Sequence, residues 1–237
     1  MLRRFMFVNL LVLVVWACGP SEDRLFDAGI ASLENRDFQK AIDYFDRLLE
    51  KNGAHAAAWN AKGVAYFEQE NWQEAIAAFD QSIIADSTNY KPFFNRGNAL
   101  LENKAYKEAV MDYNMANGLA PQQVDIYYNR GLALLGLEMY EDALVDFEQA
   151  LQANPNQPQV HFNKAKALLG NNDPVAAISS LTEAVNLDKR NAAAYYLLGV
   201  TEMSALGRKE EGCAHLKMAL SLGYPQANEW IEEFCKE

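Results

Sequence analysis

Apolar positions recur with a helical period over most of the chain, and the whole pattern restarts every 34 residues. The clearest copy is residues 124–157. There the pattern predicts one helix from Tyr127 to about Leu137 and a second from Glu141 to about Ala153, ended by an Asn-Pro pair. The sequence therefore predicts an all-α chain built from repeated helix-turn-helix units.

A small residue inside each first helix fixes the register of the repeats. These residues stand 34 apart: Gly29, Gly63, Gly97, Gly131, Ala165 and Gly199. Sixteen places after each of the first five comes a bulky apolar residue: Phe45, Phe79, Tyr113, Phe147 and Leu181. Glycine inside a helix costs about 1 kcal/mol relative to alanine, so its recurrence predicts a close approach of two helix backbones. A period of this length is typical of a solenoid, in which each unit is stabilised by its neighbours.

The motif that repeats resembles that of the tetratricopeptide repeat family. In one copy it is formed by Tyr127, Gly131, Leu134, Ala143, Phe147, Ala150 and Pro155. The resemblance covers about residues 22–223. It implies a right-handed α-solenoid of six helix-turn-helix units, a concave groove lined by the first helices, and binding rather than catalysis.

We expect residues 18–237 to form a single solenoid domain. The six units are expected at residues 22–55, 56–89, 90–123, 124–157, 158–191 and 192–223. Residues 226–236 then predict a last amphipathic helix, with an apolar stripe of Trp230, Ile231 and Phe234, that caps the C-terminal end.

The first 17 residues have a different composition. Arg3 and Arg4 precede an apolar run, residues 5–17, which is too short for a spanning helix of about 20 residues but fits a signal-peptide core. Its end at Cys18 resembles the bacterial lipobox. Residues 1–17 would then be a removed lipoprotein signal peptide, and Cys18 would carry lipid chains such as palmitate.

Two neighbouring residues bear on this interpretation. Trp16 departs from the lipobox pattern, and an ordinary secretory signal followed by a coincidental cysteine is the alternative. Gly19 resembles an outer-membrane sorting signal. We therefore expect a lipid-anchored protein of the bacterial cell envelope, located at the outer membrane.

Charge narrows the choice of partner. The chain has 21 basic and 32 acidic residues, and residues 1–17 contain two arginines and no acid, so the remainder has 19 basic residues and a net charge of −13. Such a surface repels nucleic acid and anionic headgroups. We expect no nucleic-acid partner, a membrane contact made through lipid chains, and a protein or peptide partner in the envelope.

Three positions on each first helix should face the groove, namely the fifth, sixth and ninth of the family pattern. The groove residues expected are Asn60, Phe94, Asn95, Asn98, Tyr128, Asn129, Phe162, Asn163 and Lys166. A ladder of carboxamides can donate to and accept from any extended peptide backbone, while aromatic rings add apolar contact. The alternative is that these residues only support helix packing.

Recognition of a terminal carboxylate is not expected. Relatives that clamp such a group use cations at positions where this chain has Phe94, Gln159 and Asn163.

Cys213 and Cys235 form an even pair in an exported chain, which makes them a candidate disulfide between the last full repeat and the capping helix. Two free thiols used as small hydrophobes are the alternative.

No site for chemistry is evident. His55, His161 and His215 fall in different repeats, and no nucleophile elbow, phosphate loop or paired metal-ligand spacing occurs. We predict no catalytic residue, no metal site and no cofactor.

Three functions stay open at this point. The first is a scaffold or assembly factor that binds a polypeptide in its groove. The second is a periplasmic carrier or sequestering module for a small ligand or glycan. The third is a self-associating structural lipoprotein.

Overall fold

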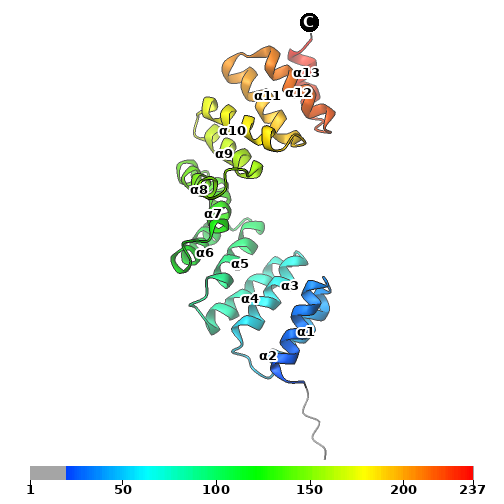
Figure 1. Ribbon diagram of the computed structural model, residues 1–237, viewed down its shortest axis with the longest axis vertical. Coiled ribbons are helices and arrows are strands. Elements are labelled where there is room, and N and C mark those ends of the chain that lie inside the picture. Colours follow the sequence, from blue (N-terminus) through cyan, green and yellow to red (C-terminus); the bar gives the residue numbers. More distant parts are fainter. Residues whose placement is uncertain (1–19, 237) are drawn as a thin grey trace, which may run out of the picture.

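The computed structural model describes residues 20–236, and within this range the chain forms α-helices and no strand. The helices are α1 (Glu22–Glu34), α2 (Phe38–Leu49), α3 (Ala56–Glu68), α4 (Trp72–Ala85), α5 (Tyr90–Glu102), α6 (Tyr106–Leu119), α7 (Val124–Gly136), α8 (Tyr140–Ala153), α9 (Pro158–Gly170), α10 (Pro174–Leu187), α11 (Ala192–Leu206), α12 (Lys209–Ser221) and α13 (Ala227–Phe234). They stack in chain order along a curved rod (Figure 1). The predicted all-α solenoid is confirmed.

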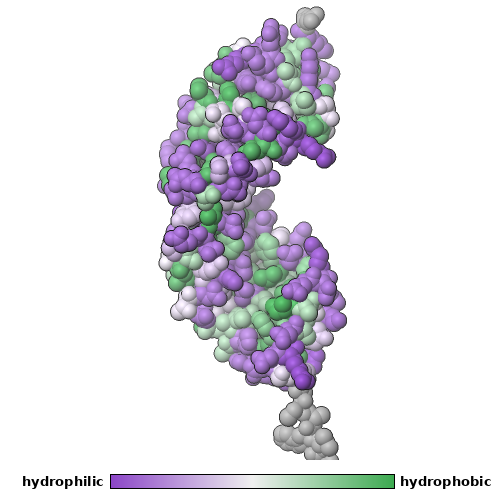
Figure 2. Space-filling view, viewed as in Figure 1, coloured by the Kyte–Doolittle hydropathy of each residue, from purple (hydrophilic) through white to green (hydrophobic). Residues whose placement is uncertain are grey.

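Each helix packs against the next one in the chain, and the first helices α1, α3, α5, α7 and α9 also touch their neighbours in that series. The first helix of the copy at residues 124–157 begins three residues before the predicted Tyr127, with Val124. Asp125 in its first turn explains the earlier start, because an acidic side chain is favourable at a helix N-terminus. The first helices lie toward the hollowed side of the rod, while α6 and α8 lie on its outer edge (Figures 1 and 2).

The recurring glycines make room for a ring from the second helix of the same unit. A Cβ atom built on Gly63 would lie 2.5 Å from the ring of Phe79, and one on Gly131 would lie 2.8 Å from the ring of Phe147. The predicted approach of two backbones is found instead at Gly199, where the new Cβ would lie 2.7 Å from the carbonyl oxygen of Gly212. In the first four units the glycine thus leaves the space that an aromatic ring of the second helix fills.

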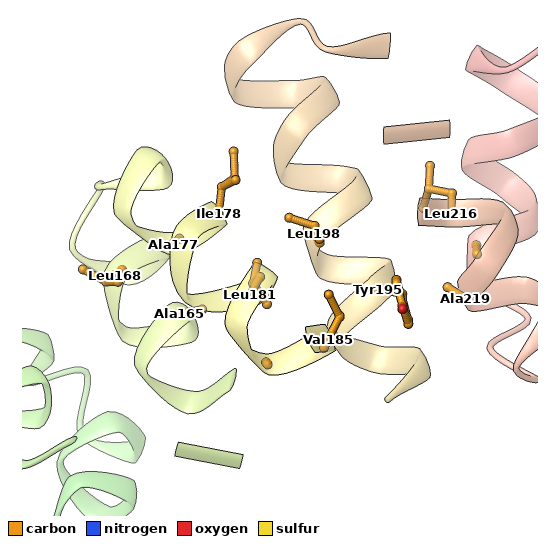
Figure 3. Packing of buried hydrophobic residues seen from close by; sticks show 13 residues of the cluster. Ala165, Leu168, Ala177, Ile178, Leu181, Val185, Tyr195, Leu198, Leu216 and Ala219 are labelled. Carbon is orange, nitrogen blue, oxygen red and sulfur yellow. The ribbon is translucent and has the colours of Figure 1, made fainter. Parts of the chain in front are cut away.

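The fifth unit departs from this rule in a consistent way. It has Ala165 instead of glycine and Leu181 instead of an aromatic residue, and both are fully buried. Figure 3 shows Leu198 of α11 directed toward Leu181, and Tyr195 directed toward the α12 residues. In this unit the second helix has the smaller Leu181 where the first four units have an aromatic ring, and the first helix has the larger Ala165 where they have glycine.

Every turn between paired helices contains a left-handed residue. The first five such residues are not glycine: Arg36, Glu70, Lys104, Glu138 and Asn172, with φ of 59–61°. In the sixth pair α11 is 15 residues long, and the left-handed position is taken by Gly207 (φ 65°), one place late. The sixth unit thus holds one extra residue before its second helix, and its first helix is longer than the others.

The capping helix α13 packs on α12, but its apolar stripe differs from the predicted one. Ala227 is fully buried, and Trp230 and Ile231 are half-buried against the C-terminal core. Phe234 remains 40% exposed, and its ring lies tilted beside that of Trp230 at a centroid distance of 5.2 Å.

Candidate functional site

The predicted groove residues lie on α3, α5, α7 and α9, on consecutive first helices that contact one another. Figure 2 shows the rod hollowed on the side these helices face, with apolar residues gathered over α3–α5. All of the predicted groove residues are half-buried except Lys166, which is exposed. This exposure leaves each side chain partly accessible to a ligand.

The three asparagines of the ladder do not bond to one another. Each donates to a residue of the preceding repeat instead. Asn95 Nδ2 donates to Asn60 Oδ1 at 3.0 Å, and Asn129 Nδ2 donates to Asn98 Oδ1 at 3.0 Å. The asparagines therefore link neighbouring first helices, as the packing interpretation requires.

Asn163 continues the series one repeat further on. Its Nδ2 donates to the hydroxyl of Tyr128 at 3.1 Å and to the backbone carbonyl of Gln159 at 3.0 Å. Burial raises the pKa of Tyr128, and the bond from Asn163 opposes that shift. Tyr128 therefore stays neutral and keeps its own hydroxyl proton available to an acceptor.

These bonds leave polar atoms of both kinds unused among the described residues. The amide nitrogens of Asn60 and Asn98 have no acceptor, and the amide oxygens of Asn95, Asn129 and Asn163 have no donor. A peptide backbone needs acceptors for its N–H groups and donors for its carbonyls. The inter-repeat bonding and peptide binding are thus compatible uses of the same residues.

Two hollows lie on either side of Asn95. One, of about 220 Å³, is lined by Tyr90, Lys91, Phe94, Asn95, Gln123, Asp125 and Ile126. The other, of about 210 Å³, is lined by Val64, Phe67, Glu68, Phe79, Asn95 and Asn98. Three of the predicted groove residues therefore border space that a ligand could fill.

The aromatic side chains of the groove contact neighbouring side chains. Phe94 packs against Tyr113 with ring centroids 6.1 Å apart, and Tyr128 packs against Phe147 at 6.2 Å. Lys166 Nζ lies 5.8 Å from the ring centroid of Phe162. Asn98 is also tied to the core, because its Oδ1 accepts from the hydroxyl of the buried Tyr113 at 2.8 Å.

A second polar series, missed in the sequence, runs beside the groove residues. A cation occupies the seventh position of four consecutive units: Lys62, Arg96, Arg130 and Lys164. Each bonds to the second helix of the preceding unit, through Asp46, Asp80, Asn114 and Glu148 respectively. The 34-residue spacing of these cations was the signal that could have revealed them.

The two arginines also bind a buried carboxylate in their own unit. Arg96 donates twice to Asp112, at 2.7 and 2.6 Å, and Arg130 donates twice to Asp146 at the same distances. Their hydrogen bonds to these aspartates raise the pKa of both arginines. Burial raises the pKa of Asp112, and the contact with Arg96 opposes that shift.

The histidines have structural roles. His55 Nδ1 accepts from the backbone of Ala58 and caps α3. His161 Nε2 lies 2.9 Å from the carbonyl of Pro155, in the same way that Trp59 donates to Gly53 six residues back. His215 pairs with the buried Glu202 at 2.7 Å. In the described range no group of three or more His, Cys, Asp or Glu residues could hold a metal ion.

The two cysteines of the C-terminal end are joined. Cys213 of α12 and Cys235 after α13 form a disulfide with Cα atoms 5.7 Å apart. The bridge connects the last helix pair to the capping helix.

Cys18, the expected lipid attachment site, lies outside the described residues. Among residues 20–236 no helix is both long and apolar enough to cross a bilayer.

The stacked helix pairs define a helical-repeat protein. A tetratricopeptide repeat profile matches residues 26–90 and 162–227, and a second one matches residues 124–157. The chain belongs to the tetratricopeptide repeat family, whose members generally act as non-enzymatic interaction scaffolds. No curated protein matches the chain significantly.

Solved structures confirm the fold. PilF of Pseudomonas aeruginosa is 23% identical with a TM-score of 0.73, over 90% of this chain and 97% of that one. YrrB, described as a TPR protein with an unusual peptide-binding site, is 22% identical with a TM-score of 0.68, over 79% and 97%. The C-terminal part of a TPR protein from Cytophaga hutchinsonii is 17% identical with a TM-score of 0.73, over 89% and 87%.

Proposed function

We propose that this chain is a lipid-anchored scaffold or assembly factor of the bacterial envelope that binds an extended polypeptide in its groove. The observation that carries the proposal is the set of unused amide donors and acceptors on successive first helices. Both kinds of atom are required by a peptide backbone. YrrB, which has a similar fold and is described as having an unusual peptide-binding site, supports the same class of ligand.

The size of the hollows favours a peptide over a small ligand. Small-molecule pockets usually enclose roughly 300–1,000 Å³, whereas the hollows beside Asn95 measure about 220 and 210 Å³. Each is of a size to receive one side chain of a bound segment. For the hollows beside Asn95, the carrier function is therefore the weaker candidate.

The anchor would hold the solenoid close to the membrane. Only three residues lie between Cys18 and Glu22, where α1 begins, and the four residue steps can span at most about 14 Å. Lys51 Nζ donates to the carbonyl of Pro20 at 2.6 Å, and Asn52 donates to Glu22 at 2.9 Å, so Pro20 and Glu22 are tied to the segment that follows α2. A lipid on Cys18 would thus place the first repeat at the bilayer surface.

The groove can be tested by photo-crosslinking in cells. A crosslinker replaces Tyr128, with one at the exposed Val175 of α10 as the control position. The proposal expects a discrete protein adduct from position 128 only, and its loss when Asn95, Asn129 and Asn163 are all changed to Ala. The matched control is Asn186→Ala, which alters an exposed asparagine outside the groove.

The outcomes separate the candidate functions. Circular dichroism must show the same helix content for the triple variant and for the wild type. An adduct that survives the triple substitution would contradict peptide binding in the groove. A non-protein ligand found by native mass spectrometry would favour the carrier, and adducts between two copies of this chain would favour self-association.

The anchor is tested separately. Radiolabelled palmitate should appear on the wild-type chain and not on Cys18→Ser. A labelled Cys18→Ser chain, or an unlabelled wild type, would contradict the lipid anchor but leave groove binding intact.

A further inference from the structure

Two equivalent hollows lie on the outer side of the rod, away from the groove residues. The first, of about 250 Å³, lies between α4 and α6, and the second, of about 280 Å³, lies between α6 and α8. Nearly every residue of the second stands 34 places after its counterpart in the first. The solenoid therefore builds the same cavity twice in succession.

Each hollow is lined by an arginine–aspartate pair, by apolar side chains and by a further carboxylate. The first has the Arg96–Asp112 pair, Leu100, Met111 and Glu108. The second has the Arg130–Asp146 pair, Leu134, Val145 and Asp142. Met111 is 67% exposed and Val145 is 57% exposed, so a large apolar side chain stands in solvent at the same place in both repeats.

Neighbouring repeats lack this construction. At the position of Leu100 and Leu134 the second repeat has Tyr66, whose ring lies 5.7 Å from Lys62 Nζ. At the position of Met111 and Val145 the second repeat has Ala77 and the fifth has Ser179. The paired hollows are thus a local feature of the middle of the rod.

Charge indicates what could occupy them. Lys107 is the only lysine or arginine on α4, α6 and α8. The same three helices expose the carboxylates Glu74, Glu108, Glu141 and Asp142. Because Arg96 and Arg130 are already bound to aspartates, this face is acidic toward an approaching molecule.

We propose that the two outer hollows bind two apolar side chains of a basic segment in a partner protein. The volumes suit side chains, since small-molecule pockets usually exceed roughly 300 Å³. The exposed carboxylates in and around the hollows complement lysine or arginine next to those side chains. A second copy of this chain, with its net negative charge, and an anionic lipid surface are both repelled by the same carboxylates.

The probe for this surface is a labelled helical peptide of about 18 residues with a leucine stripe and lysines on both flanks. Two matched probes replace the leucines by serine or the lysines by glutamate. Binding to the purified full chain is measured by fluorescence anisotropy. We expect the leucine-lysine probe to bind at least about tenfold more tightly than either matched probe.

Three single variants locate the contact. Met111→Ser and Val145→Ser should each weaken binding of the leucine-lysine probe about tenfold or more. Val175→Ser is the matched control, since Val175 is 63% exposed on α10 but lines neither hollow, and it should change the affinity less than about twofold. Changing Asn95, Asn129 and Asn163 to Ala should also leave the affinity unchanged, because this surface is independent of the groove.

Several results would overturn the proposal. No binding of the leucine-lysine probe at millimolar concentration is one, and equal binding of the serine probe is another, since charge alone would then suffice. Equal affinities for Val145→Ser and Val175→Ser would place the contact elsewhere. Binding of the Cys18→Ser chain to phosphatidylglycerol vesicles would assign the surface to a membrane if Met111→Ser abolished it. A dimer in sedimentation that Met111→Ser abolishes would assign the surface to a second copy.

Discussion

The packing of an aromatic ring over the glycine of the first helix leads to a quantitative prediction at Gly63. A Cβ atom at this position would lie 2.5, 2.6 and 2.9 Å from three carbons of the Phe79 ring. Favourable carbon contacts need about 3.5–4.0 Å, so the ring or the helix pair must move. Phe79 is 1% exposed and has little space into which it can shift.

Two opposing effects set the magnitude for Gly63→Ala. Alanine favours the helix by about 1 kcal/mol, while overpacking a well-packed core costs about 1–3 kcal/mol. Because three contacts are too short at once, we expect a cost near the upper value and a net loss of about 2 kcal/mol. Phe79→Leu alone should cost about 1–2 kcal/mol through the cavity that it leaves.

The double variant should be more stable than the sum of the single changes implies. The fifth repeat already combines Ala165 with Leu181 at these two positions, so the two substitutions together should fit. We expect a coupling free energy of about 2 kcal/mol in the stabilising direction. Urea unfolding of all four proteins, followed by circular dichroism at 222 nm, measures it.

The control is Gly118→Ala. No atom lies within 4 Å of a Cβ built on Gly118, so this change should stabilise the chain by about 1 kcal/mol. If Gly63→Ala stabilised the chain as much as Gly118→Ala, or if the two substitutions at Gly63 and Phe79 were additive, the packing argument would be refuted.

Three further predictions concern pH, the turns and the C-terminal end. Burial raises the pKa of Tyr113 above its usual value near 10, so the folded state favours the neutral phenol, and its contribution should be complete below about pH 10 and lost at higher pH. The fall in unfolding free energy from about pH 9 to pH 11 should thus be smaller for Tyr113→Phe; an equal fall would exclude this tyrosine as the cause. Glu138→Gly should raise the urea midpoint by removing a left-handed non-glycine residue (φ 60°), worth up to about 1 kcal/mol, and a lower midpoint would contradict that reasoning. The bridge between Cys213 and Cys235 closes a loop of 22 residues, so Cys235→Ser should cost up to about 3 kcal/mol, and unchanged thermal unfolding, or an intact mass that shows two free thiols in the wild type, would count against the bridge.

The architecture was predictable because a repeat states the same information several times. A 34-residue period that places glycine and an aromatic residue in register is a signal that no single irregular helix offers. What the glycine contacts was harder to predict. Spacing along the chain shows that Gly63 and Phe79 recur together, but not that the ring, rather than a backbone, lies over the glycine.

The polar series were predicted only in part. The asparagines were found because their residue type suggests peptide binding, yet their bonds to the preceding repeat depend on how far one first helix is displaced from the next. The cations Lys62, Arg96, Arg130 and Lys164 were overlooked because charged residues on a helix are usually solvated. Only the burial of Asp112 and Asp146 reveals that the two arginines are half-buried and bound to carboxylates of the interior.

The cations that join each repeat to the one before it have a mechanical consequence. In the middle of the rod Arg96 and Arg130 are forked guanidinium groups, each bound to side chains of two second helices, whereas Lys62 and Lys164 toward the ends each have one carboxylate partner. A planar fork resists rotation in a way that a single ammonium group does not. The rod should therefore flex least at its centre and most near its ends, so that its span can change to suit what it holds while the central curvature stays constant.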